Sequence, residues 1–410
     1  MTSVRIGPEN VGTDRRGTRS VSSHLLSVGY RPFFLLAGVN AWGTMSAWLI
    51  ALAGGRPPTQ VWPPPTYHAH EMIFGTVVAV IAGFLLTAVP NWTGTARVAG
   101  GRLAGLALLH AAGRLVLLFS GSIGPVQAAL VDVAFLPCLA ILIALPILRT
   151  RNWRNLPVVA VVLGMAAANV AVHRGLALAD YRLLRVGTHG AVYLVVILML
   201  IIAGRVVPNF TRNALMRSGI EVRVRNRPRW GPLAVGVACL ALVADLAWPD
   251  SRVGGVLALL AAPLLVVRQS GWQFPDTLRY PMLWVLHVGH FWLAIGFACI
   301  GISTLWAVGI GAAALHALTA GAMGTLMLGM MTRVSLGHSG RPIEAGSGTV
   351  WIFALVILGA TIRILGAWGW EAAAIYQPSV LIGGALWTAA WVLFSLLYTR
   401  ILIAPAASKA

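Results

Sequence analysis

Histidine is the residue type in this chain whose placement most clearly suggests chemistry. The sequence has 10 histidines, and all of them except His24 lie in or beside strongly apolar stretches. An ionisable side chain at membrane depth is costly and usually marks a functional site. Neutral imidazole is also the commonest metal ligand in proteins. The histidines are therefore the first candidates for metal or cofactor ligands.

His68, His70 and Glu71 form one short motif, HAHE. Two residues correspond to a rotation of about 200° on an α-helix, so the two imidazoles face opposite sides and serve separate sites. Alternatively, His68 lies in the loop made by Pro63 to Pro65. Glu71 orients an imidazole, exchanges protons or binds metal. The competing interpretation is a hydrogen-bonded helix start, where Glu is favourable.

Two further pairs have spacings that place both side chains on one helix face. His287 and His290 are three residues apart and either hold a metal or haem, or donate hydrogen bonds to facing groups. His189 and Tyr193 are four apart, which suits a metal-bound imidazole beside a phenol that gives protons or electrons. The alternative there is a simple hydrogen bond between the two side chains.

His316 begins a stripe that continues with Met323, Met327 and Met330. Thioethers suit Cu(I) and can also cap haem iron. Methionine is equally common as plain packing material in cores. Both interpretations of the methionines remain open from the sequence.

Four charged residues also fall within apolar stretches: Asp132, Asp245, Arg114 and Arg363. They pair with each other or extend to the interface, and one of the arginines could bind a haem propionate. The cysteines, Cys138, Cys239 and Cys299, are far apart and have no metal-ligand spacing. They predict neither a disulfide framework nor a thiolate metal site.

The composition places these residues in a membrane protein. Of the 410 residues, 58% are hydrophobic and 10% are charged, and the mean hydropathy is +0.81. A soluble domain has about 45–50% apolar and about 25% charged residues. The chain is therefore predicted to be an all-α polytopic protein whose partner is the lipid bilayer.

Twelve apolar runs are long enough to span a bilayer as helices. They cover residues 33–53, 68–90, 103–119, 125–148, 156–173, 184–207, 231–247, 253–267, 281–306, 310–332, 349–368 and 376–404. We expect a disordered basic tail over 1–30, a single transmembrane domain over 31–405 and a short tail over 406–410. Both tails are expected to be cytoplasmic.

The charge balance supports that orientation. The chain has 30 Lys and Arg against 11 Asp and Glu, a formal net charge of +19. With the N-terminus inside, most of the basic residues fall in cytoplasmic loops, above all between Arg205 and Arg229, as the positive-inside rule requires. The positive charge thus sets topology, and we expect no nucleic-acid partner.

A weak repeat relates every fourth span. Spans 2 and 6 each start near a histidine, His70 and His189, and end in VPN, an aromatic residue and Thr. Span 10 starts at His316 and runs to Thr332. Three pseudo-repeats of four helices would explain twelve spans and would place the three histidines at the same end.

Several long motifs resemble those of the NnrS family. They are YRPFF (Tyr30 to Phe34), HAHEMIFG (His68 to Gly75), AGFLLTAVPNWTG (Ala82 to Gly94), VPNFT (Val207 to Thr211) and the run from His316 to Pro342. The resemblance covers nearly the whole chain, with Tyr67 standing where Trp is expected. It implies a twelve-helix inner-membrane protein of bacteria that contains haem and copper and acts in nitric oxide metabolism, denitrification or nitrosative-stress resistance.

The architecture is also similar, more distantly, to haem-copper oxidases and nitric oxide reductases. Those enzymes have metal-binding histidines on helices 2, 6 and 10, and the oxidases have a His and a Tyr four apart on helix 6, as His189 and Tyr193 are here. However, the adjacent histidine pair expected on helix 7 is missing, and the HxH pair lies on helix 2. A complete oxidase-type dinuclear site is therefore not expected.

The first functional hypothesis is a protein that binds or turns over nitric oxide at histidine-ligated haem, of b type, with copper as a second metal. The haem ligands would come from His70, His189, His316, His287 and His290, metal ligands from His68, His70, His189 and His316, and catalytic groups from Glu71 and Tyr193. An oxidoreductase would take electrons from a quinol or a cytochrome. The alternatives are a permease for a metal ion, an anion or haem, and a non-catalytic haem or nitric oxide sensor.

Overall fold

The computed structural model describes residues 21–59, 61–225, 229–368 and 373–407. Within these residues every regular element is a helix, and twelve helices are long and apolar enough to cross a membrane. The predicted all-helical fold with twelve spans is therefore confirmed. Residues 1–20 of the predicted N-terminal tail and residues 408–410 lie outside the described residues, while Val21–Leu25 forms a short helix, α1.

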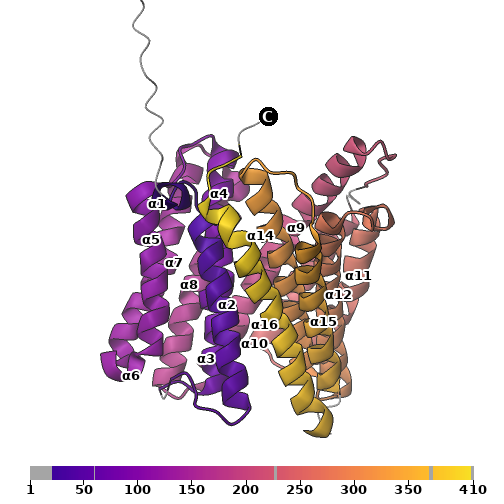
Figure 1. Cartoon of the computed structure of the whole chain (residues 1–410). Coiled ribbons are helices and arrows are strands. Elements are labelled where there is room, and N and C mark those ends of the chain that lie inside the picture. The colour runs from indigo at the N-terminus through magenta and orange to yellow at the C-terminus, as the bar shows by residue number, and fades with distance from the viewer. Residues whose placement is uncertain (1–20, 60, 226–228, 369–372, 408–410) are drawn as a thin grey trace, which may run out of the picture.

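The spans follow one another with short connections (Figure 1). In chain order they are α2 (Tyr30–Leu52); α3, η1 and α4 in one continuous run (Pro64–His70, Glu71–Val77, Val78–Thr93); α5 (Gly100–Leu118); α7 (Pro125–Arg149); α8 (Leu156–Ala177); α9 (Tyr181–Arg217); α10 (Trp230–Ala247); α11 (Arg252–Ser270); α12 (Pro281–Trp306); α13, η4 and α14 in one run (Gly311–His316, Ala317–Met323, Gly324–His338); α15 (Ser347–Trp368); and α16 (Ala373–Ile403). The short pieces are α6 (Ser120–Ile123), η2 (Trp153–Asn155) and η3 (Phe274–Thr277).

The main differences from the predicted spans are extensions at helix ends. Span 6, predicted to end at residue 207, continues in α9 to Arg217 even though Pro208 lies inside it. The added part is polar on one side and buries Thr211 and Leu215 on the other. Packing therefore sustains a helix beyond the point where the apolar run stops, which hydropathy does not register.

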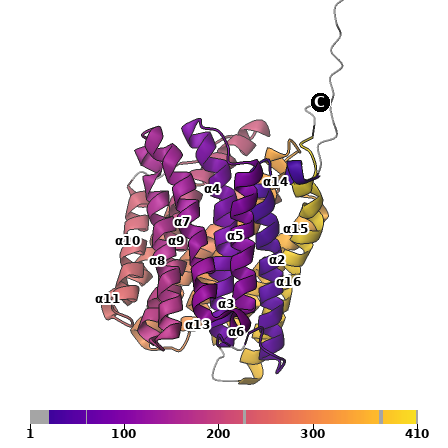
Figure 2. The ribbon, with the colours of Figure 1, turned by 90° about the vertical axis from the view of Figure 1, so that its left-hand side faces the viewer.

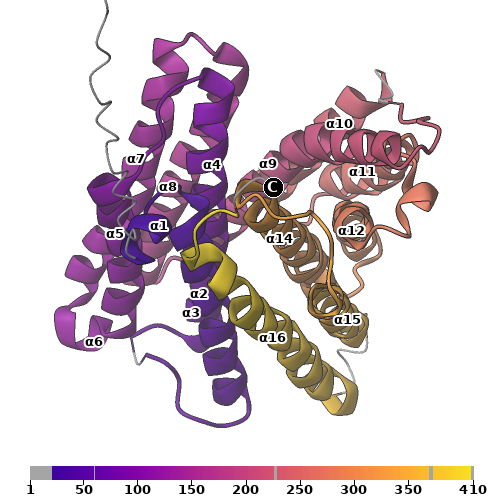
Figure 3. The same cartoon turned by 45° about the horizontal axis from the view of Figure 1, so that its top comes forward.

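Helices from distant parts of the chain surround the three central spans, which are spans 2, 6 and 10. Figure 3 shows α5, α7 and α8 on one side, α10, α11 and α12 on another, and α15 and α16 on a third. Figure 2 views the bundle from the side of α5 and α7, and in Figures 1 and 2 α1 and the end of α16 lie at one end of the bundle while α3 and α13 lie toward the other. The described chain ends are thus on the same side, as twelve spans require.

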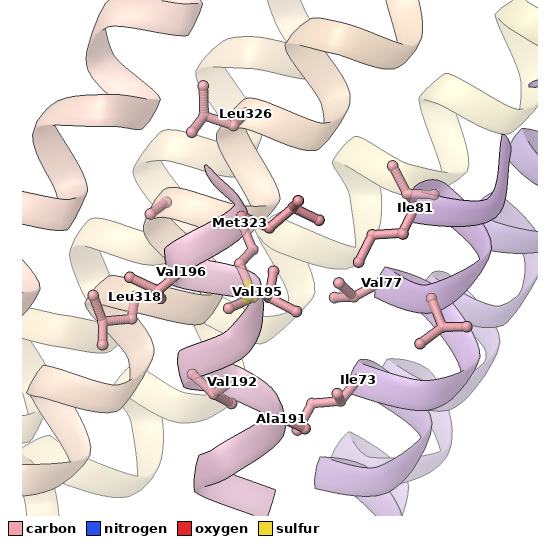
Figure 4. Close-up of a cluster of buried hydrophobic side chains, with 14 of the residues drawn as sticks. Ile73, Val77, Ile81, Ala191, Val192, Val195, Val196, Leu318, Met323 and Leu326 are labelled. Atoms are coloured by element: carbon pink, nitrogen blue, oxygen red, sulfur yellow. The ribbon is translucent and has the colours of Figure 1, made fainter. Parts of the chain in front are cut away.

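Spans 2, 6 and 10 meet in the core. Figure 4 shows their apolar side chains facing one another: Ile73 and Val77 from η1, Val192 and Val195 from α9, and Met323 from η4. This is the arrangement that a repeat of four helices would give, because each of the three is the second span of its unit. The repeat itself remains a prediction.

Two of these central spans contain a π-helical segment. Each segment is 7 residues long and begins directly after a histidine: η1 follows His70 and η4 follows His316. A π-segment changes the phase of a helix and is frequent at functional sites. Met323 and Met327 line the same cavity as His316, while Met330 does not.

The α15–α16 contact depends on two glycines. A Cβ on Gly359 would lie 2.7 Å from the carbonyl oxygen of Gly383 and 2.8 Å from the backbone nitrogen of Trp387. We expect Gly359→Ala to push the helices apart and to lower the free energy of unfolding by about 1–3 kcal/mol. Thermal unfolding in detergent measures this. Gly236→Ala is the control, since its Cβ would meet no atom within 4 Å, and equal effects of the two variants would contradict the prediction.

Candidate functional site: a cavity with three histidines

A cavity of about 450 Å³ lies between the central spans. It is bordered by α2, α3, η1, α9, α13, η4, α14, α15 and α16, and most of its lining is apolar. His68, His189 and His316, one from each central span, all line it. We call it the histidine cavity. Its size falls within the range of about 300–1,000 Å³ usual for small-molecule sites.

The His316 side chain has the tautomer and the fixed orientation that a metal ligand needs. Its Nδ1 donates a hydrogen bond to the carbonyl oxygen of Ala312, at 2.8 Å. A carbonyl only accepts, so this bond fixes the proton on Nδ1 and leaves a lone pair on Nε2 in the neutral ring. Backbone hydrogen bonds of this kind hold ligating histidines in one tautomer and one orientation.

His68 and His189 are held less firmly. The His68 ring stacks on Trp48, with ring centroids 5.0 Å apart, and its buried Nδ1 has no hydrogen-bond partner among the described residues. The Nδ1 of His189 lies 3.3 Å from the hydroxyl oxygen of Thr188. An unpaired buried ring nitrogen at a cavity wall is costly, and a ligand in the cavity would remove that cost.

Arg363 brings a positive charge to the same cavity. Its Nη2 donates to the Tyr376 hydroxyl at 3.3 Å, but its buried Nη1 has no partner in the described part of the chain. None of the described residues that line the cavity is acidic. The cavity thus combines apolar walls, imidazoles and an uncompensated guanidinium, which favours a largely apolar ligand that carries a negative group.

The three cavity histidines do not form a compact ion site. Among the described residues, His70, Asp132 and His173 are the one group of three or more such side chains whose ligand atoms all lie within 4.8 Å of one another. A single ion held jointly by His68, His189 and His316 therefore does not fit this arrangement. A group large enough to reach separate walls does.

Comparison with protein-family models identifies the chain. The model described as NnrS protein matches residues 24–406. The chain belongs to the NnrS family. Family membership makes it a multi-pass membrane protein of a family linked to nitric oxide, as the sequence motifs predicted. A search of curated proteins gives no match.

In this NnrS family member, His70 faces away from the histidine cavity. His70 and Glu71 meet Arg114 of α5, Asp132 of α7, and Asn169 and His173 of α8 in a group that we call the buried polar cluster. The two histidines of the HAHE motif thus point to different surroundings, as their two-residue spacing predicts. Glu71 also lies in the buried polar cluster, where its Oε1 accepts from Arg114 at 2.6 Å.

His287 and His290 lie outside the histidine cavity, on α12. The Nε2 of His287 lies 3.0 Å from the Thr211 hydroxyl, and the Nδ1 of His290 donates to the Gln269 side-chain oxygen at 2.8 Å. One nitrogen of each ring thus has a facing group, as in the alternative interpretation of this pair, while His287 Nδ1 and His290 Nε2 are buried without a partner in the described part of the chain. The structure offers them no place at the cavity.

Tyr193 is directed at α10 and does not line the cavity. Its ring lies edge-on to His189 with centroids 6.1 Å apart, while its hydroxyl donates to Asp245 at 2.5 Å. Arg185 donates to the same carboxylate at 2.9 Å. Asp245 is therefore satisfied by a phenol and a guanidinium from α9, and the role of Tyr193 that the structure displays is to join α9 to α10.

Loss of this phenol has a measurable consequence. We expect Tyr193→Phe to lower the free energy of unfolding by about 1.5–3 kcal/mol, because it removes a hydrogen bond to a charged group. Tyr181→Phe, on the same helix and 84% exposed, is the control and should have no effect. Unfolding curves of both variants in one detergent give the comparison. Unchanged stability of Tyr193→Phe would show that the hydroxyl is not held by Asp245.

The residues that sequence reasoning missed are Asn169 and His173 as members of a site. They are four apart on α8, so they share one face of an otherwise apolar helix. That pairing of polar residues was the available signal. Arg114, Asp132 and Arg363 were identified as intramembrane charges, but the sequence did not show their partners.

Proposed function

We propose that this membrane protein binds haem in the histidine cavity and binds or turns over nitric oxide there. The observation that carries the proposal is the convergence of His68, His189 and His316 on one apolar cavity that also contains the unpaired charge of Arg363. A haem has an apolar ring, anionic propionates and an iron that takes imidazole ligands. Each of these has a complementary feature in the cavity.

The chain's own residues would have distinct tasks toward such a group. His316 would ligate the iron through Nε2, with its ring held by the Ala312 carbonyl. Arg363 would pair with a propionate. His68 and His189 would contact the haem from other walls and leave the second coordination position of the iron open. The apolar side chains keep water out, and a neutral diatomic molecule such as nitric oxide enters an apolar site without a charged path.

Bound haem iron would supply a coordination position for nitric oxide. Electrons would come from a quinol or a cytochrome if nitric oxide is reduced. We place the protein in the bacterial inner membrane with both ends in the cytoplasm, because the arginine-rich loops are on the side of the bundle where α1 lies.

Copper is the second metal that we propose. The thioethers of Met45, Met72, Met323 and Met327 line the histidine cavity together with the imidazoles. Thioether and imidazole ligands suit Cu(I). Copper analysis of the purified protein tests this separately from haem.

The absorption spectrum of the purified protein tests the proposal. Protein made in a haem-replete host should show a Soret band and haem iron, and nitric oxide added to the reduced protein should shift that band. A colourless, iron-free protein would overturn the proposal. If such a colourless protein supported saturable, histidine-dependent uptake in proteoliposomes, the permease hypothesis would replace it.

A further inference from the structure

We propose that His70, Asp132 and His173 form a site for one divalent first-row transition-metal ion, separate from the histidine cavity. His70 ends α3 directly before η1, while Asp132 lies on α7 and His173 on α8. It does not rest on the proposed haem function, because none of its three ligands lines the cavity. Two imidazoles and one carboxylate are a common ligand set of such ions, with further positions left open.

The ligand atoms converge on a single point. The Nε2 of His173 lies 2.9 Å from Asp132 Oδ2, and the Nε2 of His70 lies 3.2 Å from the same oxygen. The side-chain oxygen of Asn169 approaches His70 Nε2 to 2.9 Å. His70 and Asp132 are almost fully buried, at 0% and 2% exposure. Two nitrogens and two oxygens thus meet inside the protein.

Hydrogen bonding leaves lone pairs facing one another at this point. Glu71 Oε1 lies 3.2 Å from His70 Nδ1, so a neutral His70 whose single ring proton is on Nδ1 has its lone pair on Nε2. That lone pair then faces oxygens of Asp132 and Asn169, which are acceptors as well. An arrangement of converging acceptors is favourable only with a positive charge at its centre, and a metal ion supplies it.

The surrounding charges support a cation. Glu71 and Asp132 carry two negative charges, and Arg114 is the guanidinium that contacts both of them. With neutral imidazoles, these groups sum to one uncompensated negative charge in a buried place, which is costly. A divalent cation would change the net charge of the cluster from one negative to one positive, whereas one proton on an imidazole would bring it to zero. A titration with Co²⁺ distinguishes a bound metal ion from a protonated imidazole.

The outer contacts resemble those that orient metal ligands. Glu71 holds the far nitrogen of His70, and Arg114 holds both Glu71, at 2.6 Å, and the Oδ1 of Asp132. A carboxylate behind a ligating histidine fixes its tautomer and raises its basicity. Arg114 contacts Asp132 Oδ1, while Asp132 Oδ2 accepts from Asn169 Nδ2 at 2.8 Å and keeps a further lone pair for the ion.

His173 is the most exposed of the three proposed ligands. His173 has a side chain that is 11% exposed, and Trp62 packs edge-on against both His70 and His173, with ring centroids 4.9 and 5.3 Å apart. Trp62 belongs to the connection between α2 and α3. Trp62 is 3% exposed, so this indole would have to move for an ion to enter from the side of the α2–α3 connection.

Cobalt loading tests the proposal on the full chain. Detergent-purified protein is treated with a chelator, separated from it and titrated with Co²⁺, with the visible d–d absorption and the bound metal per chain as readouts. We expect one equivalent of Co²⁺ for the wild type, competed by Zn²⁺. His173→Ala should weaken binding by at least about 100-fold, and Glu71→Gln by about 10–100-fold.

Two controls keep the result interpretable. His110→Ala removes a nearby buried histidine of α5 that lies outside the cluster, and His68→Ala removes a cavity histidine. Both should bind Co²⁺ as the wild type does, and size-exclusion profiles establish that every variant is folded. Equal Co²⁺ binding by the wild type and His173→Ala would overturn the proposal. Absence of Co²⁺ and Zn²⁺ binding by the wild type would overturn it too and would assign the cluster to a protonated network.

Discussion

Replacing Arg114 with methionine is expected to lower the free energy of unfolding of the metal-free protein by about 3–5 kcal/mol. The guanidinium of Arg114 contacts both Glu71 and Asp132, whose side chains are 1% and 0% exposed. Without it, two carboxylates remain buried near each other with no compensating charge. Unfolding in mixed detergent micelles, after chelator treatment, measures the loss.

A triple variant provides the control for this prediction. Arg114→Met combined with Glu71→Gln and Asp132→Asn removes all three charges while keeping similar side-chain volumes. It should recover most of the lost stability, because the penalty comes from unpaired charge and not from packing. A single Arg114→Met variant as stable as the wild type would show that the two carboxylates are not both charged and buried as the structure places them.

The second large effect concerns the haem. His316→Ala is expected to reduce the haem bound per chain by at least about 10-fold, because ligation by a pre-oriented imidazole carries much of the affinity. Haem content is measured from the absorbance of the extracted pigment. His290→Ala is the control, since His290 is also a histidine of a membrane-spanning helix but lies outside the cavity; it is fully buried, whereas His316 is half-buried.

The two variants together show which histidine ligates the haem. Haem loss in His316→Ala with retention in His290→Ala is the expected pattern. The reverse pattern would place the haem at α12. Equal loss in both, with normal elution of each protein, would contradict ligation by His316 specifically.

Hydropathy was sufficient for the fold because lipid imposes a strong constraint on helix length. It predicted the break between α12, ending at Trp306, and α13, beginning at Gly311, to within a residue. The HAHE spacing likewise predicted that His68 and His70 have different surroundings. Both results follow from the regular geometry of a helix.

The details of the sites depend on features that spacing does not contain. The π-segments η1 and η4 change helix phase directly after His70 and His316. Consequently, the sequence could not show that His68 is the HAHE histidine that shares the cavity with His316. The sequence also placed Tyr193 beside His189, but a carboxylate on the next helix, Asp245, offers the phenol a stronger partner.

The sequence also could not predict which polar residues, far apart in the chain, contact one another in the fold. The buried polar cluster joins residues from α3, η1, α5, α7 and α8, and Asn169 lies 99 residues from His70 in sequence. One sequence lists which charges lie in the membrane, but not which of them meet. The structure shows which charged residues meet, because α5, α7 and α8 pack beside span 2.

A cryo-electron-microscopy map of the purified, pigmented protein in lipid nanodiscs tests whether haem occupies the histidine cavity. We expect a flat density in the histidine cavity, in contact with His316 and with an edge toward Arg363. A cavity that holds only lipid or detergent, with the haem density beside His287 and His290 or at the lipid-facing surface, would contradict it.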